Sequence, residues 1–211
     1  MGVVIERVSF RVGGRLILDD VSVEVRAGER VAVVGPSGSG KTTLLTLLAG
    51  VDRPDAGRVL LDGAPLLRPT PRVALVLQGY GLLTLLTAAE NVQVALRAAG
   101  RRPADALLLA ARALDALALD DRADHLVEEL SGGQQQRVAV ARALAVAPRV
   151  LLADEPTAEQ DVEHRDLVVE ALLNVTTAGA ALVLATHDPA IAERCDRIVE
   201  IHHGRLSPTP R

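Results

Sequence analysis

The chain has 211 residues, a length that suits one large domain or a core with an inserted subdomain. Apolar residues make up 49% and aromatic residues only 1%, so the core must consist of aliphatic side chains, and the net charge of −4 argues against a nucleic-acid-binding surface. The single cysteine, Cys195, excludes an internal disulfide and is typical of a reducing compartment.

The N-terminal segment predicts a partly antiparallel sheet. Val21, Val23 and Val25 alternate with polar residues, which is the period of a half-buried strand. Residues 3–5 and 59–61 are apolar runs, and we expect the three segments to share one sheet. No basic region followed by an apolar run opens the chain, so we expect no signal peptide.

A glycine-rich sequence follows the next strand. Residues 30–34 are a nearly continuous apolar run, typical of a buried parallel strand, and residues 41–49 predict a helix that Gly50 ends. The sequence between them is typical of a phosphate-binding loop, whose backbone N–H groups surround a phosphate. We expect a nucleoside triphosphate to be bound by Gly35, Pro36, Ser37, Gly38, Ser39, Gly40, Lys41, Thr42 and Thr43.

Lys41 is the only lysine of the chain, and every other member of its 23 Lys+Arg residues is arginine. A compact ammonium group on a flexible stem reaches between phosphate oxygens, where a planar guanidinium is wider and stiffer. Lys41 is therefore expected to contact the β- and γ-phosphates, and the Thr42 hydroxyl to ligate Mg²⁺. A glycine–serine turn that fits the pattern by chance is disfavoured by the strand before it and the helix after it.

Three further buried strands are predicted at residues 73–77, 150–153 and 181–185, and each ends at polar residues. In open α/β sheets, ligands bind beyond the C-terminal ends of such strands. We expect Asp154 to hold the Mg²⁺ shell and Glu155 to orient or deprotonate the attacking water. An acidic pair after a strand usually marks a solvated loop, but a neighbouring phosphate loop favours the catalytic interpretation.

The pattern predicts one α/β nucleotide-binding domain over residues 1–211, with a P-loop NTPase core, a mixed sheet and an N-terminal antiparallel β subdomain. Residues 1–78 and 150–206 are assigned to the core and the β subdomain, and 79–149 to an inserted α-helical subdomain. Residues 207–211 are expected to be a disordered tail. Nothing in the sequence predicts a membrane span.

A second glycine-rich sequence, at residues 130–134, precedes a predicted helix over residues 135–147. A glycine-rich helix start is an anion site, although taken alone it indicates no more than a helix-initiating turn. One triphosphate does not need two complete cradles from one chain. We therefore expect the second cradle to come from another subunit, with two-fold symmetry producing two shared sites. Its residues are Ser131, Gly132, Gly133 and Gln134.

The order and spacing of these motifs resemble the nucleotide-binding domain of ATP-binding cassette (ABC) transporters, nearly end to end. The resemblance implies that residues 35–42 are the Walker A motif, 150–155 the Walker B motif and 130–134 the signature motif. It also implies three single-residue roles. Gln78 senses Mg²⁺ and the transmembrane partner, His187 contacts the γ-phosphate, and Asp161 is the D-loop aspartate.

Three residues depart from the family pattern. The family commonly stacks adenine on an aromatic residue just before a glycine pair, where this chain has Val12. Aromatic pairs contribute about 0.5–1.5 kcal/mol beyond area burial, so we expect weaker selectivity for ATP over GTP. Gln160 stands where the family usually has leucine and is expected to alter contact across the dimer, and Leu77 replaces a frequent phenylalanine.

Within the family, residues 82–92 resemble the lipoprotein-release and macrolide-export branch, with Thr84 in place of a typical proline. The resemblance implies an ATPase subunit that binds ATP and Mg²⁺, forms a dimer, and powers a separate transmembrane permease from the cytoplasmic face of the membrane. An importer subunit is the competing assignment within the transporters. The sequence also leaves open a soluble family member acting in translation or DNA repair, a regulator with negligible turnover, and a P-loop kinase.

Overall fold

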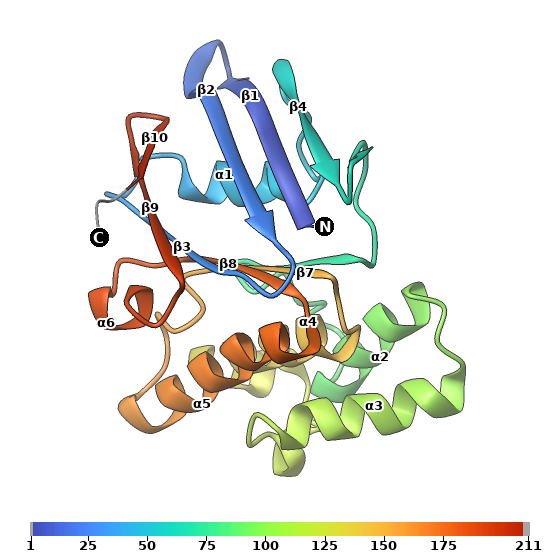
Figure 1. The fold of residues 1–211 in the computed structure, drawn as a ribbon. Helices are drawn as coiled ribbons and strands as arrows, with labels where there is room; N and C mark the ends of the chain where they lie inside the picture. Colours follow the sequence, from blue (N-terminus) through green and yellow to red (C-terminus); the bar gives the residue numbers. More distant parts are fainter. Residues whose placement is uncertain (1, 209–211) are drawn as a thin grey trace.

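The computed structural model describes residues 2–208 and contains two stacked sheets with helices between and below them (Figure 1). The first sheet is antiparallel, in the order β2-β1-β4-β5, as the valine alternation predicted. A tight turn at Gly13 and Gly14, both with positive φ, joins its two long strands. Its members are β1 (Gly2–Val12), β2 (Arg15–Arg26), β4 (Ala56–Leu61) and β5 (Ala64–Pro65).

The second sheet has the order β10-β9-β3-β8-β7-β6. All its neighbouring strands run parallel except β10, which is antiparallel to β9. Because the strands β3, β6, β7 and β8 run the same way, their C-terminal ends meet at one edge. The members are β3 (Arg30–Val34), β6 (Val73–Val76), β7 (Val150–Asp154), β8 (Ala181–Ala185), β9 (Arg197–His202) and β10 (Arg205–Pro208).

Apart from Arg30 and Asp154 at their ends, the central strands β3, β7 and β8 are apolar because both of their faces are covered. In β7, Leu151 and Ala153 pack into one core with the lower helices, whereas Val150 and Leu152 pack into a second core beneath the antiparallel sheet. Helix α1 (Lys41–Leu48) belongs to the second core and lies between the two sheets (Figure 1). Helices α4 (Gly132–Ala145) and α5 (Val162–Leu173) cover the opposite face.

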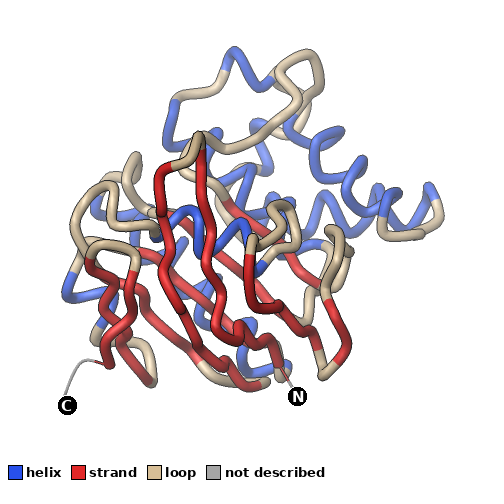
Figure 2. Tube along the Cα trace, turned by 90° about the horizontal axis from the view of Figure 1, so that it is seen from above, coloured by secondary structure: helices blue, strands red, loops and turns tan. Residues whose placement is uncertain are grey.

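Helices α2 (Ala88–Ala98) and α3 (Pro103–Asp115) form a lobe with α4, and Figure 2 shows helices that extend beyond the strands at the upper right. Thr87 and Glu90 cap the start of α2 reciprocally. The buried Asn91 amide bonds the backbone of Leu83 in both directions, at 2.8 and 3.0 Å, which anchors the loop before α2. The short helix α6 is Pro189–Ala192. Within residues 2–208, no helix is both long enough and apolar enough to cross a membrane.

The α/β class with a mixed sheet is confirmed, but several predicted boundaries differ. Helix α4 begins at Gly132 rather than Gln135, because Ser131 caps it and both glycines enter its first turn. The predicted tail is wrong for Ser207 and Pro208, which pair with β9 as part of β10. Residues 209–211 lie outside the described part of the chain.

Candidate active site

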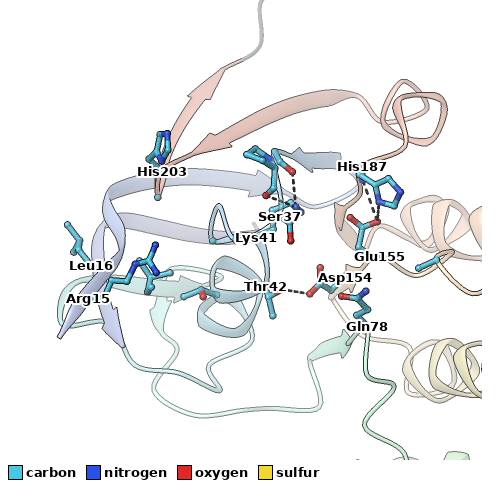
Figure 3. Close-up of a pocket in the computed structure, with 18 residues that line it drawn as sticks. Arg15, Leu16, Ser37, Lys41, Thr42, Gln78, Asp154, Glu155, His187 and His203 are labelled. Carbon is cyan, nitrogen blue, oxygen red and sulfur yellow. Dashed lines mark hydrogen bonds and ion pairs between the residues drawn. The ribbon is translucent and has the colours of Figure 1, made fainter. Parts of the chain in front are cut away.

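A cavity of about 760 Å³ lies at the edge where the parallel strands end (Figure 3). Several separate stretches of the chain line it, because β3, β6, β7 and β8 each deliver the loop that follows them to this edge. The predicted site residues among its walls are Gly35, Pro36, Ser37, Gly38, Gly40, Lys41, Thr42, Thr43, Gln78, Asp154, Glu155 and His187.

The loop between β3 and α1 depends on its glycines. Gly35 has φ 154° and Gly40 has φ 110°, conformations that L side chains rarely adopt. A Cβ on Gly35 would lie 2.3 Å from the Ile201 carbonyl oxygen. The loop can therefore turn tightly against β9 and direct its backbone N–H groups, together with the start of α1, into the cavity. A loop of this geometry can bind a phosphate group.

Lys41 lies across this loop. Its Nζ donates to the carbonyl oxygens of Gly35, at 2.8 Å, and Pro36, at 3.2 Å (Figure 3). These backbone acceptors orient the ammonium group toward the loop that surrounds the phosphate position. Ser39 is predicted to bind nucleotide but does not line the cavity: it is buried, and its hydroxyl has no hydrogen-bond partner within residues 2–208.

Thr42 and Asp154 meet at the floor of the cavity, 112 residues apart in sequence. The Thr42 hydroxyl donates to Asp154 Oδ2 at 2.6 Å, and the Asp154 residue is only 3% exposed. Within the described residues, Asp154 makes no ion pair, so a neutral hydroxyl is the partner of this buried carboxylate. With the Gln78 amide on the same wall, these oxygens are the hard ligands that Mg²⁺ prefers.

Glu155 is held in a strained backbone conformation directly after β7. Its φ of 47° is unusual for a residue with a side chain, and its N–H donates to the Ala185 carbonyl on the neighbouring strand. The Glu155 Oε2 atom accepts from the His187 Nδ1, at 2.9 Å when that nitrogen carries the proton. The Glu155 side chain is 12% exposed and the His187 side chain 75%. A shielded carboxylate beside an exposed imidazole is suited to general-base chemistry.

The second glycine-rich element lies in a different hollow. Ser131 Oγ accepts from the Gln134 N–H at 3.3 Å, and Gln134 Oε1 accepts from the Ser131 N–H at 2.9 Å. This reciprocal cap leaves Gly132 and Gly133 in the first turn of α4, beside a hollow of about 410 Å³. One chain therefore does not bring its two anion-binding elements to the same cavity.

Asp161 and Val12 also lie away from the first cavity. Asp161 caps α5 by accepting from the His164 N–H at 2.9 Å, and hydrogen bonds from the His164 backbone and side chain lower the pKa of this carboxyl group. Val12 is at the tip of the β1–β2 hairpin, 57% exposed, and is not among the residues that line the cavity.

The sequence did not single out Arg15, Leu16 and His203, which line the cavity at the end away from Glu155 (Figure 3). Strand β9 ends at His202, and His203 is a turn residue with φ 47°. The sequence signal for a turn at this point was the glycine that follows, Gly204, which also lines the cavity.

Other titratable side chains offer little competing chemistry. Within residues 2–208, no group of three or more His, Cys, Asp or Glu side chains is placed to hold a metal ion. Burial raises the pKa of the Cys195 thiol to about 11, so it is protonated at neutral pH and is not a reactive thiolate.

Similarity to known proteins identifies the family to which this chain belongs. The sequence model of the ABC transporter family matches residues 18–158. The chain belongs to the ABC transporter family. As an ABC protein it is 44% identical over 200 residues to the lipoprotein-releasing system ATP-binding protein LolD of Paramagnetospirillum magneticum, covering 90% of this chain and 88% of that protein.

A second relative shows the cassette joined to other sequence. The macrolide export ATP-binding/permease protein MacB of Brucella melitensis biotype 1 is 43% identical over 201 residues. The match covers 90% of this chain but 31% of that protein, so the chain spans about a third of the length of this relative.

A solved structure agrees over the whole length. The dimeric post-hydrolysis state of the ATP-binding cassette MJ0796, bound to ADP and Pi, superposes with a TM-score of 0.90 at 31% identity and covers 99% of both chains. The predicted family and the cassette fold are confirmed, and the homologous ABC cassettes are ATPases.

Proposed function

We propose that this chain is the ATP-hydrolysing subunit of an exporter and powers a separate membrane permease. The observation that carries the proposal is the placement of two anion-binding elements of one chain in two different hollows. A triphosphate held by both then lies between two subunits, and each subunit contributes a different element. Nucleotide binding closes such a dimer, and loss of the γ-phosphate after hydrolysis allows it to open.

The chain's residues have distinct roles in this proposal. Lys41 and the loop N–H groups bind the phosphates, and Glu155 accepts the proton of the attacking water. Thr42, Asp154 and Gln78 would hold Mg²⁺, which neutralises phosphate charge when bound. His187, bonded to Glu155, contacts the γ-phosphate, and the partner's nucleotide is completed by Ser131, Gly132, Gly133 and Gln134.

The relatives support the partners that we propose. LolD belongs to a lipoprotein-releasing system, and the MacB name joins a macrolide-export ATP-binding part to a permease. The cassette MJ0796 is dimeric. We infer a homodimer that binds the cytoplasmic face of the membrane through its permease, and export as the direction of transport. We also propose that residues 79–149 form a helical subdomain inserted in the nucleotide-binding core.

Mixing two inactive variants tests the shared site. Lys41→Ala disables a subunit's own phosphate loop, and Ser131→Arg disables the cradle that it offers to its partner. Each variant alone is expected to lose Mg²⁺-dependent phosphate release. In an equimolar mixture, half of the dimers pair the two variants and have one of two sites intact, so about a quarter of the wild-type sites return.

The matched control mixes Lys41→Ala with Glu155→Gln. Both residues serve the same subunit's own site, so no pairing restores an intact site and no activity should return. Recovery in this control, or none in the first mixture, would refute sites shared between subunits.

Nucleobase selectivity tests the role of Val12. Its replacement by tyrosine is expected to tighten ATP binding by about two- to tenfold, because a ring at the hairpin tip would add an aromatic contact of about 0.5–1.5 kcal/mol. The wild-type chain should bind ATP and GTP with similar affinity in fluorescence titrations. Val51→Tyr, at an equally exposed valine that follows α1 and is not part of the β1–β2 hairpin, is the control. A strong wild-type preference for ATP would contradict this prediction.

A further inference from the structure

The loop after Glu155 is bonded to the start of helix α4 by one side chain, Gln160. Its Nε2 donates to the Gly133 carbonyl oxygen at 2.8 Å and to Gln136 Oε1 at 3.2 Å. Its Oε1 accepts from Arg137 Nη1 at 3.2 Å. Both ends of this one amide are thus used, and all three partners belong to the first turns of α4.

The contact continues from α4 to the backbone of Glu155. Gln136 is fully buried, and its Nε2 donates to the Glu155 carbonyl oxygen at 2.8 Å. Its Oε1 also accepts from the Glu159 N–H at 3.2 Å. Gly133 and Glu155 are therefore joined through only two amide side chains, those of Gln160 and Gln136. Because both amides are partly or fully buried, water competes weakly for these bonds.

Two further observations show that the loop packs closely on α4 and that the Gln160 amide serves a buried partner. A Cβ on Gly133 would lie 2.6 Å from the Glu159 carbonyl oxygen, so the loop packs directly on the glycine turn. Arg137 is only 6% exposed, and its Nε has no hydrogen-bond partner within residues 2–208. The Gln160 oxygen therefore satisfies a buried guanidinium that has few other acceptors.

We propose that Gln160 is a positioning residue that clamps the glycine turn of α4 to the loop behind Glu155, so that these two elements move as one unit. This inference rests on the proposed function, in which the glycine turn serves the partner's nucleotide and Glu155 serves the subunit's own. Gln160 then links the two nucleotide sites of the dimer. Breaking the clamp lets the glycine turn of α4 move relative to the partner's nucleotide but leaves the phosphate loop of the same subunit intact.

Gln160→Glu separates the donor bonds from side-chain size. The carboxylate still accepts from Arg137 but faces the Gly133 and Gln136 oxygens without a proton to donate. In the Glu155→Gln background, ATP-driven dimerisation, measured by sedimentation, should require at least tenfold more protein. In the otherwise wild-type chain, kcat should fall by at least tenfold. ATP binding to the monomer at low protein concentration should stay within twofold, since Gln160 is not a wall of the first cavity.

Gln135→Glu is the matched control. It makes the same glutamine-to-glutamate change within the first turns of α4, which Gln160 contacts, but the Gln135 amide donates to the Leu130 carbonyl and not to the loop after Glu155. It should leave dimerisation within twofold. Gln160→Leu keeps a side chain of similar size and should weaken dimerisation in the same direction, which covers a failure of Gln160→Glu to fold.

The results distinguish the two proposals. If Glu155→Gln alone does not dimerise with ATP, the proposed function fails. If it dimerises and both folded Gln160 variants dimerise equally well with unchanged kcat, the clamp is refuted. Equal weakening by Gln135→Glu would also refute it, because the effect would then belong to the helix start in general.

Discussion

Replacing Glu155 by glutamine is expected to reduce ATP turnover by at least a hundredfold while ATP stays bound. General-base catalysis contributes about 10²–10⁴-fold, and an amide of the same shape cannot accept the proton. The contacts that hold this position survive, because the backbone bonds to Ala185 and Gln136 do not involve the carboxylate. With hydrolysis blocked, the closed dimer should accumulate in ATP, as seen by size-exclusion chromatography beside a phosphate-release assay.

Glu163→Gln is the control for this prediction. Glu163 lies in the first turn of α5, is exposed, and is outside the cavity walls, so the same chemical change should leave turnover unaltered. Wild-type turnover by the Glu155 variant would refute its assignment as the base. Loss of ATP binding would instead show that this carboxylate has a structural role.

Replacing Lys41 by arginine is expected to weaken ATP binding by about a hundredfold or more, although the charge is kept. The Lys41 Nζ lies 2.8 and 3.2 Å from two carbonyl oxygens of the loop, and a planar guanidinium does not fit between them and a phosphate. A hydrogen bond to a charged group contributes about 1.5–3 kcal/mol and leaving that group unpaired costs more, so a loss of about a hundredfold in affinity is expected. Calorimetric titration with Mg·ATP measures the effect.

The control is the reverse substitution, of arginine by lysine, at an exposed position. Arg101→Lys, on the exposed loop between α2 and α3, puts a lysine where the chain has arginine and should change nothing. If Lys41→Arg binds ATP normally, the unique lysine is a consequence of composition and not of phosphate chemistry.

The phosphate loop could be predicted because its conformation depends on neighbours in sequence. Gly35, Gly40 and Lys41 lie within seven consecutive residues, and the glycines alone allow the positive φ values that the loop requires. Strands β3 and β8 were predicted with their observed bounds because a sheet covered on both faces demands continuous apolar runs. The start of α4 was missed because glycine is a poor helix former that a serine cap can overcome.

Contacts between distant segments were not predictable in the same way. Gln160 could be identified as unusual for its position, but its bonds to Gly133 and Gln136 depend on how the loop after β7 packs against α4. His203 and Arg15 lie at the cavity because the β9–β10 turn comes to rest beside the start of β2, where Asp19 donates its N–H to the Gly204 carbonyl. The hydrophobic periodicity of the sequence does not predict this contact between the β9–β10 turn and β2.

The amino-acid sequence by itself determined the family and predicted the phosphate loop, the acidic pair and the second anion-binding turn, because each is a short pattern whose chemistry depends on adjacent residues. Only the tertiary structure decided that the two anion-binding elements face different hollows and that Gln160 joins one of them to the loop of Glu155. Those relations depend on strand order and on the face that each helix buries, and both are set by packing between segments far apart in the chain.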